Sequence, residues 1–425
     1  MRRTDVVIVG GGQAGLAMSR CLSAERIEHV VLERGRVAQR WRSDRWDSLR
    51  LLTPNWMTRL PAFHYDGPDP DGFMTASELV VFFERYARSF PAPIETNTQV
   101  DAIEIDATGG TFLVTTTRGV WHTRNVVVAT GYSDQPLVPA IAARLDGGVH
   151  QIVPSGYRNP AALPGGGVLV VGASATGIQL ADEIQASGRR VVISTGQHLR
   201  VPRRYRGRDI MWWLDRAGIL DATEESVFDV EASRQAPSFQ LVGRDDHATL
   251  DLEHLRRAGV VVAGRLMAIA GHRLHFADDL VKTTAAADVK LAGLLSRLDT
   301  TRLEEVVEEP EPFTPLWPAF VSAPAELDLR AEGIEVVVWA TGYRRSYSWL
   351  KIPLLDARGE LIHHGGVTPC AGMYAIGLPF QRTRKSAFID GVGADARVLT
   401  KCIAIRLGQQ RKPEHDSTCS SVVAV

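Results

Sequence analysis

Two stretches of the sequence repeat one order of elements: an apolar run, a glycine-spaced turn and a helix-like segment. In the first stretch Val6–Val9 leads into Gly10–Gly15, and in the second Val168–Val171 leads into Gly172–Gly177. Continuous apolar runs suit strands of a parallel sheet that is covered on both faces. A strand that hands over to a helix through such a turn is typical of dinucleotide-binding domains. The duplication predicts an α/β protein with two Rossmann-like domains.

The first turn carries the full Gly-x-Gly-x-x-Gly pattern at Gly10, Gly12 and Gly15. The first glycine permits the tight turn, the second allows the backbone to approach a pyrophosphate, and the third permits close packing of helix and strand. The helix start then presents free N–H groups and a positive dipole end to the phosphates. The next apolar run ends at Glu33, where an acid can accept hydrogen bonds from ribose hydroxyls. We therefore expect FAD at this turn.

The second turn departs from the pattern, because Ser174 stands between Gly172 and Gly177. A small side chain still permits close approach of a phosphate. The following strand ends in Ser194 without an acid, and three arginines come soon after it, at Arg200, Arg203 and Arg204. Guanidinium groups without a nearby acid suit the 2′-phosphate of NADPH, and a solvated surface run is the alternative interpretation.

An Ala-Thr-Gly-Tyr segment ends an apolar run downstream of each turn, at Ala129–Tyr132 and at Ala340–Tyr343. This spacing favours an FAD domain that is discontinuous, with the NADPH domain inserted in it. We place the first part of the FAD domain at 1–158, the NADPH domain at 159–334, and the second part of the FAD domain with a tail at 335–425.

The composition of the 425 residues limits the classes of partner that the protein can be expected to bind. A net charge of −1 removes the electrostatic argument for nucleic acid or an anionic membrane. No stretch reaches the roughly 18 to 20 apolar residues that a membrane helix needs. The four cysteines form no C-x-x-C, so we predict no metal site and no redox-active dithiol. A cytoplasmic protein fits best, and a homodimer is left open.

With the two turns and two further segments taken together, the sequence resembles the class B flavin-dependent monooxygenases. This family includes flavin-containing monooxygenases, N-hydroxylases, plant auxin-forming enzymes and Baeyer–Villiger enzymes. The resemblance rests on the glycine turns, on Trp41–Asn55 and on Gly391–Ala396, and it covers most of the chain. It implies that FAD is reduced by NADPH, forms a C4a-hydroperoxide with molecular oxygen, and transfers one oxygen atom to a small organic substrate.

The resemblance also implies roles for individual residues. Asn55 is similar to the asparagine near the peroxide, Trp41–Asn55 to the segment beside the flavin ring, and Gly391–Asp395 to the helix start that faces the pyrimidine end. With the turns, the expected FAD contacts are Gly10, Gly12, Gln13, Ala14, Gly15, Glu33, Arg34, Trp41, Arg50, Leu51, Val100, Ala129, Thr130, Gly131, Val392 and Gly393. The expected NADPH contacts are Gly172, Ser174, Ala175, Thr176, Gly177, Ser194, Arg200, Arg203, Arg204, Ala340, Thr341 and Gly342.

One departure from the family bears on the substrate. The family fingerprint before the second turn sets a histidine four residues ahead of an aromatic residue, whereas His150 here precedes Tyr157 by seven. The departure favours N- or S-oxygenation over Baeyer–Villiger insertion. The alternative function is an NAD(P)H–flavin oxidoreductase that passes electrons to a quinone or protein acceptor. A non-enzymatic redox sensor is a third interpretation, without positive support.

Other segments are less legible. The sequence favours a linker over 133–164, helices over 210–220 and 286–298 that cover the active site, and a frayed tail over 409–425.

Overall fold

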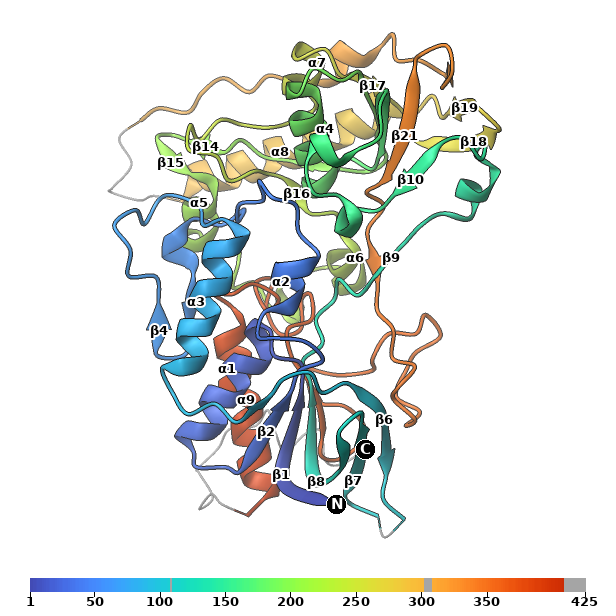
Figure 1. Cartoon of the computed structure of the whole chain (residues 1–425). Helices are drawn as coiled ribbons and strands as arrows, with labels where there is room; N and C mark the ends of the chain where they lie inside the picture. The colour runs from blue at the N-terminus through green and yellow to red at the C-terminus, as the bar shows by residue number, and fades with distance from the viewer. Residues whose placement is uncertain (108, 302–307, 409–425) are drawn as a thin grey trace.

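The computed structural model describes residues 1–107, 109–301 and 308–408, and Figure 1 shows two α/β domains stacked one above the other. The lower, first domain contains the N-terminus and the last described helix, and the upper, second domain contains the middle of the chain. The two predicted Rossmann-like domains are confirmed. The tail predicted over 409–425 lies outside the described residues.

The first domain is built on a seven-stranded sheet in the order β5-β2-β1-β8-β7-β6, with β23 also paired to β8. β1, β2, β5, β8 and β23 pair in parallel, and β6, β7 and β8 form an antiparallel extension. The strands are β1 Arg2–Val9, β2 His29–Leu32, β5 Ile94–Glu95, β6 Val100–Ile105, β7 Phe112–Thr116, β8 Gly119–Val128 and β23 Met373–Ala375.

Three helices cover one face of this sheet. α1 (Gln13–Ala24) packs along α9 (Val392–Arg406), and α3 (Ala76–Arg88) lies beside them (Figure 1). α3 begins at a capping box in which Thr75 and Glu78 satisfy each other's backbone N–H groups. Apolar side chains of the three helices and of β1 form one continuous core, and a second core fills the opposite face of the sheet.

The second domain is built on a five-stranded parallel sheet in the order β10-β21-β11-β12-β17. Its strands are β10 His150–Ile152, β11 Gly167–Val171, β12 Val191–Ser194, β17 Val261–Ala263 and β21 Ile334–Trp339. α4 (Ala175–Ala186) and α7 (Leu252–Arg257) lie on one face. A small antiparallel sheet, formed by β18 Leu266–Ala270, β19 Arg273–Phe276 and β20 Glu326–Asp328, lies on the other.

The insertion of the second domain into the first is confirmed, because β23 returns to pair with β8. The predicted boundaries differ from the structure. β10 precedes residue 158, and all of β21 except Ile334 follows residue 334, yet both strands belong to the second sheet. The predicted linker over 133–164 is therefore partly structured. It contains β9 (Gln135–Pro136), β10 and three short turns of 3₁₀ helix, η2 Ala140–Arg144, η3 Pro154–Gly156 and η4 Pro160–Ala162.

The two predicted helices of the middle segment are present with other bounds, as α5 (Ile210–Arg216) and α8 (Leu280–Thr300). They share an apolar cluster with Met57 of the first domain. The remaining elements are α2 Gln39–Ser43, α6 Val230–Gln235, η1 Asn55–Met57, η5 Glu224–Ser226, η6 Trp317–Phe320, β3 Arg59–Leu60, β4 Phe63–His64, β13 Leu199–Arg200, β14 Arg204–Tyr205, β15 Arg208–Asp209, β16 Phe239–Gln240 and β22 Tyr343–Arg344. Among the described residues, none of the helices is both long enough and apolar enough to cross a membrane.

Candidate functional site

The first glycine turn joins β1 to α1 and opens onto a cavity of about 530 Å³, the first cavity. Gly10 has φ +114°, and a Cβ there would press on the carbonyl oxygen of Ala129. A Cβ on Gly15 would overlap the carbonyl oxygen of Gly10. Both positions therefore require glycine for reasons internal to the protein.

Gly12 differs from its neighbours, because a Cβ built on it meets no protein atom within 4 Å. It lies at the N-cap of α1, no side chain caps this helix, and Gly12 lines the first cavity. The free space above Gly12 and the uncapped N–H groups together form a cradle for an anionic group. The residues present thus fit the pyrophosphate of a dinucleotide.

Glu33 follows β2 at the same edge of the sheet, and only 8% of it is exposed. Its carboxylate accepts the N–H of Gly11 at 2.7 Å and that of Gly35 at 2.9 Å. These two bonds fix the carboxylate on the wall of the first cavity, where its remaining lone pairs can accept from ribose hydroxyls.

Most of the predicted FAD contacts line the first cavity. They are Gly10, Gly12, Gln13, Ala14, Glu33, Arg34, Trp41, Val100, Ala129, Thr130 and Gly131. Gly15, Val392 and Gly393 do not line it. Val392 is fully buried, and a Cβ on Gly393 would contact the ring of Pro61.

The second glycine turn repeats the geometry of the first and opens onto a second cavity of about 760 Å³. Gly172 has φ +109°, and a Cβ there would overlap the carbonyl oxygen of Ala340. A Cβ on Gly177 would likewise overlap the carbonyl oxygen of Gly172. Ser174 is the N-cap of α4 without a capping hydrogen bond, so the helix start is open. The predicted contacts that line this cavity are Gly172, Ser174, Ala175, Thr176, Ser194, Ala340, Thr341 and Gly342.

The two cavities share part of their wall. Trp41, Arg45, Tyr132 and Ser133 line both of them, and we name these four residues the shared wall. The guanidinium carbon of Arg45 lies 5.0 Å from the centroid of the Trp41 ring. Because the cavities adjoin, ligands in them can approach one another.

The predicted 2′-phosphate arginines serve other purposes. Arg200 pairs with Asp288 at 2.7 Å and with Asp251 at 3.5 Å. Arg203, 1% exposed, donates to the Leu52 carbonyl at 2.8 Å and pairs with Asp209; burial lowers its pKa. Arg204 donates to the carbonyl of Gly207. The structure does not bring these three arginines to the second cavity, whereas Arg265 does line it.

Asn55, the predicted catalytic residue, is buried, and both ends of its amide bond to backbone. Nδ2 donates to the carbonyl of Asp69 at 2.9 Å, and Oδ1 accepts the N–H of Met74 at 2.8 Å. It lines neither cavity, so in this arrangement its side chain braces the loop over 69–74. Its catalytic role stays a prediction.

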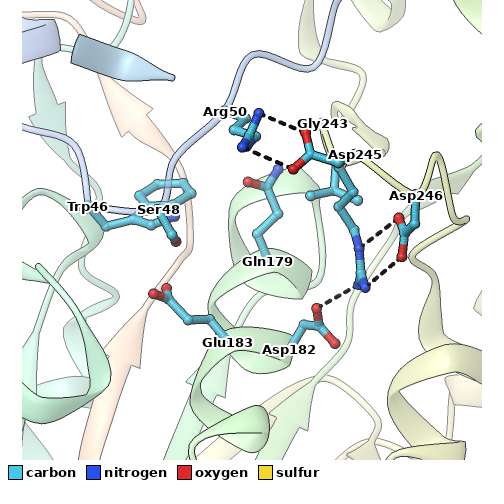
Figure 2. Close-up of a pocket in the computed structure, with 11 residues that line it drawn as sticks. Trp46, Ser48, Arg50, Gln179, Asp182, Glu183, Gly243, Asp245 and Asp246 are labelled. Carbon is cyan, nitrogen blue, oxygen red and sulfur yellow. Dashed lines mark hydrogen bonds and ion pairs between the residues drawn. The ribbon is translucent and has the colours of Figure 1, made fainter. Parts of the chain in front are cut away.

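Arg50 and Leu51 line the second cavity rather than the first. Figure 2 shows a further pocket, of about 470 Å³, between the segment around Trp46 and the second domain. Here Arg50 pairs with Asp245 at 3.0 Å and so joins the two domains. Trp46 and Leu49 also pack into the core of the second domain. The segment predicted to lie beside the flavin therefore bridges the domains.

Asp395 lies in the first turn of α9 and is 2% exposed. Burial raises the pKa of this carboxyl to about 6, although Ser386 and Arg382 oppose the shift. Its Oδ2 has no hydrogen-bond partner within the described structure. The start of α9 thus holds a carboxyl group that is neutral in mildly acidic solution.

Comparison with known proteins identifies the family. Residues 7–209 match the family model of the pyridine nucleotide-disulphide oxidoreductases. An uncharacterized CzcO-like oxidoreductase of Geobacillus kaustophilus is 34% identical over 399 residues, which are 93% of this chain and 97% of that relative. The chain belongs to the CzcO-like oxidoreductases.

More distant similarities are to monooxygenases. This chain is 25% identical to the probable indole-3-pyruvate monooxygenase YUCCA3 of Arabidopsis thaliana, over 96% of this chain and 88% of that protein. It shares the fold of a flavin-containing monooxygenase from Stenotrophomonas maltophilia with a TM-score of 0.66 and 18% identity, over 96% of this chain and all of the other. The protein is thus an oxidoreductase enzyme that has the fold of the flavin-containing monooxygenases. Enzymes of this type take FAD and NADPH as cofactors.

Proposed function

We propose that this CzcO-like oxidoreductase holds FAD in the first cavity and NADPH in the second, and transfers one oxygen atom from molecular oxygen to a small organic substrate. The observation that carries the proposal is the shared wall. Trp41, Arg45, Tyr132 and Ser133 line both cavities, so two dinucleotides bound there can meet without a carrier between them.

The chemistry that FAD supplies when bound is hydride acceptance and oxygen activation. The protein's own part is to bind and orient. The open start of α1 above Gly12 holds the FAD pyrophosphate, and Glu33 holds the adjacent ribose. The open start of α4 at Ser174 holds the pyrophosphate of NADPH.

A dithiol relay has no support at this site. No cysteine is among the described residues that line either cavity. Cys21 is buried against the helices of the first domain, and burial raises the pKa of its thiol to about 11, which keeps it protonated. These observations favour electron transfer from NADPH to flavin and oxygen over transfer to a disulfide.

The substrate is proposed to be an amine or a thioether with an apolar body. Trp46, Leu49 and Leu52 line the second cavity next to the shared wall and offer an apolar surface. Baeyer–Villiger insertion is less favoured, because His150 lies exposed at the start of β10 and lines neither cavity.

The test is to reduce the purified flavoprotein with NADPH without oxygen, and then to add isotopically labelled molecular oxygen with a panel of amines and thioethers. We expect stoichiometric FAD, rapid reduction by NADPH, and one labelled oxygen atom in the product. If the reduced protein delivers electrons to quinones while no substrate gains label, the electron-transfer alternative is correct and the monooxygenase proposal is wrong.

A further inference from the structure

The ends of β2 and β12 are equivalent positions in the two domains, and they differ in charge. The residue after β2 is Glu33, a buried acid that would repel a phosphate on the neighbouring ribose. β12 ends instead at the neutral Ser194, which lines the second cavity with Gly196, Gln197 and Arg265. A dianionic group can therefore be accommodated at this end of the second cavity but not at the matching end of the first.

Ser194 also fixes the neighbouring loop. Its hydroxyl donates to the carbonyl of Gly264 at 2.9 Å and accepts the N–H of Leu266 at 3.0 Å. These two residues flank Arg265 in sequence, so the hydroxyl holds the backbone on both sides of the arginine in place. Because β12 and β17 are parallel neighbours, Ser194 and Arg265 lie at the same edge of the sheet.

The charge of Arg265 is oriented by one carboxylate. A guanidinium nitrogen pairs with Oδ2 of Asp279 at 3.1 Å, and the backbone N–H of Arg265 donates to Oδ1 of the same residue at 3.2 Å. The side chain remains 55% exposed, so its other N–H groups face open space. Arginine offers five donors in a planar fork, and one carboxylate contact leaves donors for a phosphate.

The other arginines of the second cavity lie elsewhere. Arg45 belongs to the shared wall, and Arg50 pairs with Asp245 in the pocket of Figure 2. Among the described residues that line this cavity, Arg265 is the arginine that lies beside Ser194, at the carboxyl ends of β12 and β17.

We infer that Arg265 binds the 2′-phosphate of NADPH and thereby selects NADPH over NADH. The inference rests on the proposed function in one respect only, namely that the second cavity receives the nicotinamide dinucleotide. It assigns to one exposed side chain the role that the sequence suggested for Arg200, Arg203 or Arg204.

The experiment compares Arg265→Ala with Arg204→Ala, which removes an equally charged, exposed arginine outside the cavity. The ligands are 2′,5′-ADP and 5′-AMP, measured by calorimetry on the FAD-loaded protein, and KM is measured for NADPH and NADH. We expect Arg265→Ala to weaken 2′,5′-ADP binding and to raise the KM of NADPH by about 10- to 100-fold, with 5′-AMP and NADH unchanged. Arg204→Ala should match the wild type.

Arg265→Lys keeps the charge without the planar fork and should restore part of the discrimination. Flavin content and the unfolding temperature establish that each variant is folded. The inference is overturned if Arg265→Ala leaves 2′,5′-ADP binding unchanged, or if it weakens 5′-AMP and NADH equally. Ligand binding does not depend on oxygen transfer, so a protein that binds 2′,5′-ADP through Arg265 and oxygenates nothing would refute only the proposed function.

Discussion

The sharpest test of the first cavity is the pair Gly12→Ala and Gly15→Ala, which adds the same methyl group at two points of one turn. At Gly12 the new Cβ meets no protein atom within 4 Å, and φ of −85° is ordinary for alanine. The loss of a glycine N-cap costs about 0.5–1 kcal/mol of stability. The methyl group does, however, occupy the space into which a pyrophosphate would come. We expect a folded protein that binds FAD about 100-fold more weakly, equivalent to about 2.7 kcal/mol.

At Gly15 the new Cβ overlaps the carbonyl oxygen of Gly10 inside the protein. This variant should lose fold and flavin together, through backbone displacement between β1 and α1. The assay is the ratio of visible flavin absorbance to protein absorbance, with circular dichroism and thermal unfolding on the same samples. A Gly12→Ala protein that purifies with a full complement of flavin would show that the space above Gly12 is not the pyrophosphate site.

Three further outcomes are expected. Glu33→Gln replaces the carboxylate that accepts the Gly11 N–H with an amide, and should weaken FAD binding about tenfold, measured by titration of the apoprotein with FAD. Unchanged affinity would show that the carboxylate does not face the ribose. Arg203→Ala should reduce the free energy of unfolding in urea by about 3–5 kcal/mol because Asp209 loses its partner, whereas Arg204→Ala should change it little. Equal effects of the two substitutions would contradict the structural role given to the buried Arg203. The pKa of Asp395 is raised from 3.8 to about 6 in the folded protein, so the free energy of unfolding falls as pH rises from about 4 to 6 and this carboxyl ionises. Asp395→Asn should therefore raise the free energy of unfolding by up to about 3 kcal/mol above pH 6 and leave it unchanged below pH 4. An effect on thermal unfolding that does not depend on pH would refute this.

The sequence was informative where a requirement is local. A positive φ and a close carbonyl oxygen demand glycine at Gly10 and Gly172, and these demands can be inferred from the spacing within each turn. The order of strand, turn and helix likewise follows from apolar patterning over a few residues. For these reasons the two domains and their glycine turns were predicted.

Long-range partners decided the points that the sequence did not predict. Arg203 does not line the second cavity, and its guanidinium bonds to the Leu52 carbonyl, 151 residues away in sequence, and to Asp209. Arg265 follows β17 at the carboxyl edge of the second sheet, which is the signal that could have identified it. The domain boundaries were misplaced because β21 joins the second sheet by pairing with β11, and β10 joins it by pairing with β21; neither pairing can be inferred from the residues of the strand itself.

The chain passes between the domains through two short strands that lie side by side. β9 leaves the first domain and β22 returns to it, with Gln135 opposite Arg344 and Pro136 opposite Tyr343. Beyond them the N–H of Leu137 donates to the carbonyl of Gly342 at 2.9 Å. In topological terms the second domain is the greatly enlarged loop of a β-hairpin, so a few residues joining Gln135 directly to Arg344 would restore an unbroken hairpin. Because the chain leaves and re-enters the first domain at this one crossing, the second domain is inserted there without rerouting any strand of the first sheet.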